Sequence, residues 1–345
     1  MINSFSVVRS FTLSLIISSV ILILSVGQDS TEIKIHPAEN YPRWLMNDLY
    51  KTNQTSGMTF LREKDDSTLE FLLADDIGKI HRLCIEDDTL FSFSEIKFSD
   101  EVTNYFADFP KLDFEEICYD KYTGEVYITI EGNGHEHLLY HGIYKLIFKD
   151  NNIFQDSVID LEKFEFIPKE MFYKNLLPNI GYEGLAADEN YFYLGLENKQ
   201  TADSNFSEQT LIRIVDKNTL KIVSEISTEN LGISTICGLC SDQNFSLWGI
   251  DRNHRKVFKL LFDEYFSIVD LNFFDIQTVI PQYNHFEYVG SLESITIVSE
   301  KFLFLVDDPW HKFFIPPNEI LNQLDANTVN NFSNFIPIIH KFVFE

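Results

Sequence analysis

The stretch Glu183-Gly184-Leu185-Ala186-Ala187 has four counterparts elsewhere in the chain. Each copy begins with a small or acidic residue and continues mainly with apolar or β-branched residues, which is the composition of a strand. The copies recur about every 60 residues, and self-similarity at a long period is the signature of a repeat architecture. The five copies occupy residues 56–60, 115–119, 183–187, 237–241 and 293–297.

Two further strand-like runs follow each copy, so every repeat supplies at least three strands. The second run ends in an acidic residue, and these residues are Asp75, Glu131, Glu197, Asp251 and Asp307. The third run contains a basic residue, and these residues are Arg82, Lys145, Arg213, Lys259 and Lys341. A β-sandwich of about twenty strands would explain the strands, but it would not explain a repeat in three parts.

The start of the mature chain is predicted to complete the last repeat. A fourth run follows in four repeats, whereas the fifth repeat ends with the chain at Glu345. Residues 31–35 closely match the fourth run of the first repeat, residues 94–98. Pairing this segment with the C-terminal repeat closes a ring and protects the strand edges. The sequence therefore predicts an all-β fold, a five-bladed β-propeller closed by the N-terminal strand, with a loop insertion at 308–337.

The N-terminus has the pattern of a signal peptide. It carries Arg9, an apolar run over residues 11–24 and then small residues at 25–27. Such a run is shorter than the roughly 20 residues of a membrane span, so cleavage after residue 27 is favoured over an uncleaved anchor. The sequence predicts a secreted or periplasmic protein whose single domain covers residues 28–345.

The net charge narrows the range of partners. The 345 residues include 53 acidic and 27 basic ones, which gives a formal charge of −26. Nucleic acid and anionic membranes are therefore poor partners, whereas cations are natural ones. The simpler alternative is that the acidity only keeps a secreted, monomeric protein soluble.

The first residues of the five copies are candidate metal ligands. In a propeller the first strand of each blade lines the central channel, so these residues converge on one axis. Carboxylates brought together either take up protons or bind a cation. Oxygen donors in a flexible ring suit Ca²⁺ better than Zn²⁺ or Mg²⁺, and water or backbone carbonyls would complete the shell. The ring consists of Ser56, Glu115, Glu183, Cys237 and Glu293.

Two readings of these acids remain open. They bind a cation, or they pair with the basic residues of the third runs, although those bases are expected nearer the blade periphery. The second-run acids form another fivefold set, which we expect around one mouth of the channel as ligand-binding candidates. They could equally be a solvated rim. This set is Asp75, Glu131, Glu197, Asp251 and Asp307.

The repeat resembles a family of secreted propellers, the SdiA-regulated and esterase-like or phytase-like proteins. The segments at 182–186 and 292–295 look like that family's Glu-Gly-Ile/Leu-Ala strand start, and residues 73–80 look like its second-strand turn. The ring is also similar to that of the calcium-activated nucleotidases, which are five-bladed propellers with a central Ca²⁺. Cys237 departs from the pattern, since Ser or Glu is expected there. The resemblance implies Ca²⁺ ligands at Ser56, Glu115, Glu183 and Glu293.

The sequence predicts a function only in outline. It has no Gly-rich phosphate loop, no His-Glu-x-x-His helix and no Gly-x-Ser-x-Gly turn, so no catalytic residue is assigned. One hypothesis is a Ca²⁺-binding module that holds a cation-bridged anionic small molecule or an extracellular partner. The alternative is a Ca²⁺-dependent phosphatase or esterase, in which the cation polarises the substrate.

Overall fold

β-Strands joined by short connections dominate the computed structural model, which describes residues 33–65, 67–201 and 203–345. The predicted signal peptide lies outside the described residues, as do residues 31 and 32 of the predicted closing strand. No helix among the described residues is both long and apolar enough to cross a membrane.

A four-stranded antiparallel meander is the recurring unit, and it forms a separate sheet at two places. One of these sheets consists of β11 (Tyr182–Ala187), β12 (Tyr191–Leu196), β13 (Leu211–Asp216) and β14 (Lys221–Ser227). The other consists of β15 (Leu239–Cys240), β16 (Ser246–Asp251), β17 (Lys256–Phe262) and β18 (Ile268–Asp275). The first strand of this second sheet is much shorter than the predicted run at 237–241.

The eight-stranded sheet contains two such meanders, joined at their outer strands. β6 and β10 pair in parallel through only two residue pairs, Lys97 with Ser157 and Phe98 with Val158. The first meander is β3 (Thr55–Asp65), β4 (Thr68–Asp75), β5 (Lys79–Glu86) and β6 (Leu90–Phe98). The second is β7 (Asp113–Asp120), β8 (Glu125–Glu131), β9 (Gly142–Phe148) and β10 (Ser157–Lys163).

The last sheet joins the two ends of the described chain. β1 runs antiparallel to β23, and backbone bonds between Lys34 and Glu345 extend the pairing by one residue pair. Within the described residues, the closing segment therefore runs from Lys34 to Pro37 and overlaps the predicted 31–35 at Lys34 and Ile35. The strands are β21 (Leu292–Val298), β22 (Phe302–Asp307), β23 (Ile338–Phe344) and β1 (Ile35–Pro37), with β2 (Arg43–Trp44) also on β23.

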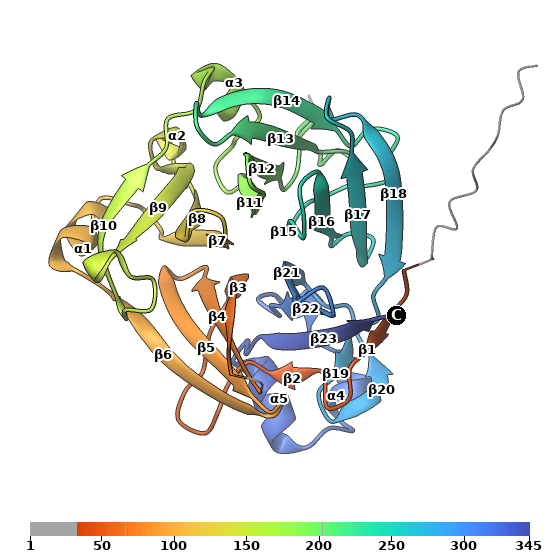
Figure 1. Cartoon of the computed structure of the whole chain (residues 1–345). Coiled ribbons are helices and arrows are strands. Elements are labelled where there is room, and N and C mark those ends of the chain that lie inside the picture. The colour runs from red at the N-terminus through yellow and green to blue at the C-terminus, as the bar shows by residue number, and fades with distance from the viewer. Residues whose placement is uncertain (1–32, 66, 202) are drawn as a thin grey trace, which may run out of the picture. The chain divides into compact units, whose positions relative to one another are not determined.

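The meanders are arranged around a common centre (Figure 1). Their first strands lie innermost, and each contacts the next, so the contacts run from β3 through β7, β11, β15 and β21 back to β3. This closed circle of first strands makes the architecture propeller-like.

The core lies in layers between neighbouring meanders. Leu72 of the first meander packs with Phe114 of the second, and Tyr193 of the β11 meander packs with Phe258 of the β15 meander. Aromatic rings supply much of this packing, as when Tyr127 meets Phe192 edge to face at 4.9 Å between ring centroids. Many of the 32 phenylalanines are therefore needed to fill these layers.

Short helices occupy the connections. Those before residue 300 are α1 (Asp100–Phe106), α2 (His137–Tyr140), η1 (Lys149–Asn151) and α3 (Lys169–Tyr173). The predicted insertion at 308–337 connects β22 to β23 and contains η2 (Lys312–Phe314), α4 (Asn318–Leu321) and α5 (Ala326–Ser333). Phe332 of α5 is buried with Ile280 and Tyr288, so α5 packs beside the hairpin of β19 (Val279–Ile280) and β20 (Tyr283–Glu287).

Candidate cation site in the channel

β-Bulges position four of the five predicted ring residues at the starts of the first strands, whereas Cys237 lies before the short strand β15. The pairing of β11 with β12 shifts register between Tyr182 and Gly184, which leaves Glu183 as the extra residue. The same shift occurs around Glu293 in β21 and around Ser56 in β3. In β7 the irregularity spans Glu115 and the residue after it. A bulge re-aims the side chain of its extra residue, which is why these positions differ from an ordinary strand alternation.

Glu183 and Glu293 come together with Cys237 in one buried group. One ligand atom from each lies within 4.8 Å of the others. Oxygen Oε2 of Glu183 is buried and has no hydrogen-bond partner among the described residues. Burial raises the pKa of Glu183 well above its usual range, and the charge of Glu197 raises it further against the lowering effect of Arg252. Burial also raises the pKa of Cys237 well above its usual range, so its thiol stays protonated.

Arg252 supplies a positive charge to this group from within the protein. It follows β16, and its Nη1 donates to Oε1 and Oε2 of Glu293 at 2.6 and 2.5 Å. Its Nη2 donates to Oε1 of Glu197 at 2.8 Å. Arg252 thus satisfies two carboxylates and leaves Glu183 without a direct partner.

Glu115 belongs to a second group, with Asp76 and Asp113, whose ligand atoms also lie within 4.8 Å of one another. Lys111 is the base of this group: its Nζ lies 2.6 Å from Oδ1 of Asp76 and also pairs with Asp113. Burial raises the pKa of Glu115 well above its usual range, followed by the charges of Glu131, Asp76 and Glu183. The two groups therefore do not share ligand atoms within 4.8 Å, but the charge of Glu183 in one group raises the pKa of Glu115 in the other.

Ser56 is buried near these acids, and its hydroxyl donates to the backbone oxygen of Phe114. The hydroxyl oxygen keeps free lone pairs, so Ser56 can serve as a neutral metal ligand, unlike the charged carboxylates. The structure therefore brings Glu183 and Glu293 together, places Glu115 in a separate group, and ties Ser56 to the backbone between Asp113 and Glu115 of that second group.

Three of the five second-run acids hold the loops that lead into the first strands. Asp75 accepts hydrogen bonds from Thr55 Oγ1 at 2.7 Å and from the Asn53 amide, and His81 Nε2 lies 2.7 Å from it. Asp251 and Asp307 accept from the backbone amides of Ser234 and Ser291 in the same way. These three carboxylates are occupied by the protein itself.

Glu131 and Glu197, the other two acids of that set, act on the ring acids electrostatically: the charge of Glu131 raises the pKa of Glu115, and that of Glu197 raises the pKa of Glu183. Oε1 of Glu131 is buried without a hydrogen-bond partner among the described residues, and burial raises its pKa well above the usual range. Glu197 pairs with Arg252. Asp308 adds another buried carboxylate, and its Oδ1 has no hydrogen-bond partner among the described residues. Burial raises the pKa of Asp308 well above its usual range.

The third-run bases do not pair with the ring. Their side-chain partners include Glu70 for Arg82, Glu125 for Lys145, and Asp242 for Lys259. Within the described residues, none of the ion pairs of these bases reaches Ser56, Glu115, Glu183 or Glu293. The alternative that the ring acids simply neutralise these bases is therefore not what the structure has.

Glu116 closes the channel immediately beyond the ring. The equivalent positions of the other repeats are Gly57, Gly184, Gly238 and Ser294. Oε1 of Glu116 accepts from the Ile117 amide at 3.0 Å and from Ser294 Oγ at 3.1 Å. Burial raises its pKa well above the usual range. This carboxyl group thus bridges first strands across the space that the glycines leave.

Sequence reasoning did not identify Lys111, Asp113 or Glu116 as part of the site. Glu116 had a detectable signal, since it is the only acid at a repeat position otherwise held by Gly or Ser. Lys111 and Asp113 precede the aligned segment, and no repeat pattern marks them.

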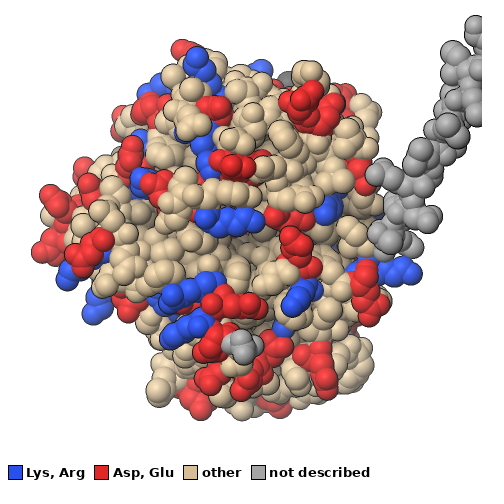
Figure 2. Space-filling model, viewed as in Figure 1, with Lys and Arg blue, Asp and Glu red and all other residues tan. Residues whose placement is uncertain are grey.

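On the face shown in Figure 2, acidic and basic side chains alternate around the centre of the ring. The large negative charge of the chain is therefore not a uniform field over this face. Several of the buried acids described above keep oxygens that have no hydrogen-bond partner among the described residues.

No protein-family model matches the chain, and no curated protein matches it in sequence. Among solved structures, the PQQ-bound aldose sugar dehydrogenase of Streptomyces coelicolor aligns with a TM-score of 0.49 and 10% identity, over 91% of this chain and 99% of that chain. A luciferin-regenerating enzyme aligns with a TM-score of 0.41 and 12% identity, over 90% and 95%. A streptogramin B lyase gives 0.37 and 8%, over 88% and 97%. The propeller-like architecture rests on the strand pairing, not on these likenesses.

Proposed function

We propose that the channel binds a divalent cation at Glu183, with Ca²⁺ as the ion that best matches its donors. The observation that carries the proposal is the unpartnered Oε2 of this buried carboxylate, in a group whose acids, Glu183 and Glu293, outnumber its one base, Arg252. A buried, unpaired carboxylate is costly unless it holds a proton or a cation. The raised pKa of Glu183 reflects that cost.

The donor set favours a hard cation. The predicted ligands Ser56, Glu115, Glu183 and Glu293 offer oxygen only, and Ca²⁺ accepts six to eight oxygens in flexible geometry. Glu131 and Asp308 carry further oxygens without protein partners. Cys237 remains a protonated neighbour, since a neutral thiol is a poor ligand for Ca²⁺. Arg252 competes with the cation for Glu293. We therefore expect the cation to lie closer to Glu183 than to Arg252.

We further propose that the chain is a secreted, five-bladed propeller that acts as a binding module. Counting the eight-stranded sheet as two meanders gives five blades. Glu183 and Glu293 come from the first strands of different meanders, β11 and β21, so one cation between them would hold these two strands together. Coordination positions left to water at the channel mouth would accept an oxygen donor from an anionic small molecule or an extracellular partner.

The test is thermal unfolding with Ca²⁺ and with chelator, using wild-type protein and Glu183→Gln. Ca²⁺ at about 100 times its Kd should stabilise the wild type by roughly 2.7 kcal/mol, because it binds the folded state only. Glu183→Gln should respond much less, since it loses the charge but keeps the size. Glu116→Gln is the matched control: it alters a buried carboxyl one layer away whose Oε1 accepts hydrogen bonds and whose Oε2, like that of Glu183, has no partner, but which belongs to neither group of candidate ligands. It should respond like the wild type.

Equal Ca²⁺ responses of the wild type and Glu183→Gln would remove the ring from the account. A Ca²⁺ response that is lost in Glu116→Gln but kept in Glu183→Gln would place the cation at Glu116, and this would contradict the proposed site at Glu183. Phosphatase and esterase assays with Ca²⁺ and with chelator should show no turnover. Robust metal-dependent turnover would replace the binding module with a hydrolase.

A further inference from the structure

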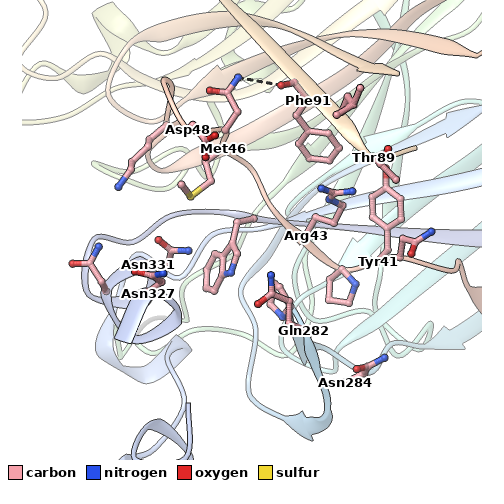
Figure 3. Close-up of a pocket in the computed structure, with 18 residues that line it drawn as sticks. Tyr41, Arg43, Met46, Asp48, Thr89, Phe91, Gln282, Asn284, Asn327 and Asn331 are labelled. Atoms are coloured by element: carbon pink, nitrogen blue, oxygen red, sulfur yellow. Dashed lines mark hydrogen bonds between the residues drawn. The ribbon is translucent and has the colours of Figure 1, made fainter. Parts of the chain in front are cut away.

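A second hollow, of about 950 Å³, lies outside the acidic channel groups (Figure 3). Its wall is formed by residues 40–51, the turn between β5 and β6, the turn between β19 and β20, and helix α5. Protein pockets that bind small-molecule ligands have volumes in this range. No pattern in the sequence indicates this hollow, because its walls come from segments far apart in the chain.

Side-chain amides dominate the polar lining of this hollow. Asn331 is only 9% exposed, yet its side-chain amide makes no hydrogen bond within the described residues. The same lack of a side-chain partner holds for Asn40, Gln282, Asn284 and Asn327, of which Figure 3 labels the last three. Each such amide presents both a donor and an acceptor. The hollow therefore displays an array of paired donors and acceptors that the protein itself does not use.

The hollow is poor in acids although the chain is rich in them. Asp48 is the only acidic residue among those that line it, against Arg43 and Lys51. Arg43 is partly engaged by the protein: its guanidinium lies 5.0 Å from the ring centroid of Phe91, and Nη1 donates to the backbone oxygen of Asp88 at 3.4 Å. A cationic ligand would find little attraction here, and the lining suits a neutral one.

Aromatic rings complete the lining. Trp44 is half-buried and packs edge to face on Phe332 at 4.9 Å between centroids. Its indole N–H makes no hydrogen bond within the described residues, and the buried hydroxyl of Tyr41 also lacks a partner. These rings combine an apolar body with an unused polar group.

We propose that this hollow binds a neutral oligosaccharide. Sugar hydroxyl groups are paired donors and acceptors, which side-chain amides match, and the C–H faces of sugar rings pack on aromatic rings. Asn331, Asn327, Asn284 and Gln282 would bind hydroxyl groups, and Trp44 would contact a ring face. This inference is independent of the proposed cation, because none of these residues belongs to the channel groups.

The test is calorimetric titration of the full chain with a panel of neutral gluco-, manno-, galacto-, xylo- and N-acetylglucosamine oligosaccharides. At least one should bind with a Kd of about 1 mM or tighter. The double variant Asn284→Ala/Asn327→Ala should weaken binding roughly tenfold or more, because it removes two exposed amides that line the hollow from two different elements, the β19–β20 hairpin and α5. Asn104→Ala is the matched control, since Asn104 is an exposed helical asparagine in α1, and its affinity should match the wild type.

Tryptophan fluorescence gives a second readout. Binding should change the emission of Trp44, and Trp44→Phe should remove that change, whereas Trp310→Phe should keep it because Trp310 does not line the hollow. Three results overturn the proposal: no binding by any neutral oligosaccharide, binding that the double variant leaves unchanged, and binding only of acidic sugars or peptides. Circular dichroism would verify that each variant is folded.

Discussion

The two ends of the central channel use the same first strands for opposite chemistry. At one end, the strand-start positions carry Glu115, Glu183 and Glu293 with Lys111 and Arg252 between them. Beyond Glu116, a small hollow of about 40 Å³ is lined by first-strand residues and by no charged side chain. Its polar lining includes Thr59, Cys118, Cys240 and Thr296.

The difference shows which features the fold dictates. Ring closure brings five first strands together at both ends, so convergence on the axis alone does not make a site. The uncharged end is satisfied internally, as when the Tyr119 amide donates to Thr59 Oγ1 at 3.0 Å. The acidic end keeps buried oxygens that the protein does not satisfy. Among the described residues, the acidic end is where such oxygens lie in groups with other candidate ligand atoms, and that grouping is the physical reason to bind a cation there.

The largest expected effect comes from removing Arg252, a positively charged side chain at the acidic end. Arg252→Met should lower the free energy of unfolding by about 3–5 kcal/mol in chelator at pH 8, because it leaves Glu293 and Glu197 buried and unpaired. Added Ca²⁺ should restore part of the loss. Denaturant unfolding with and without Ca²⁺ measures both quantities.

Arg255→Gln is the control for this variant, since Arg255 lies in the same turn but is exposed. It should behave like the wild type. A loss of less than about 1 kcal/mol in Arg252→Met would mean that the acidic end is already neutral without Arg252, and the contrast between the two ends would fail.

A smaller effect is expected at the layer between the two ends. A Cβ atom at Gly57 would lie 2.7 Å from the backbone nitrogen of Ile117, so Gly57→Ala forces two first strands apart. We expect a loss of about 1–3 kcal/mol in the free energy of unfolding, measured with denaturant. Thr59→Ser, which keeps the hydroxyl on the same strand, should cost at most about 1 kcal/mol. Equal stability of Gly57→Ala and wild type would contradict the close strand packing.

The repeat pattern located most strands and the ring positions, because strand composition and spacing are written in local sequence. It could not show the bulges at Ser56, Glu183 and Glu293, which depend on pairing with the next strand. It also overestimated the first strand of the fourth repeat, where only Leu239–Cys240 is regular.

The roles of the acids were harder to predict than their positions. Asp75, Asp251 and Asp307 share one place in the repeat with Glu131 and Glu197, yet the three aspartates hold neighbouring loops while the charges of the two glutamates act on the ring acids. The repeat position alone does not separate these two roles. Lys111 and Asp113 entered the site from a connection that carries no repeat signal.

Proton release gives the acidic end a distinctive signature. Burial raises the pKa values of Glu115, Glu131 and Glu183 above the unfolded value of about 4.3. Their protonated forms therefore favour the folded state fully below that pH, and this contribution is lost as pH rises through the raised folded values. Without metal, the contribution of these groups to stability should fall with rising pH. A bound cation needs the ionised carboxylates, so it must displace protons.

The most direct test of the central claim is calorimetric titration of Ca²⁺ into chelator-treated, desalted protein, in two buffers with different ionisation enthalpies near pH 7. We predict saturable binding whose observed heat differs between the buffers, affinity that increases with pH, and much weaker binding by Glu183→Gln. An absence of binding heat in both buffers, or the same affinity in wild type and Glu183→Gln, would contradict a cation site at the acidic end of the channel.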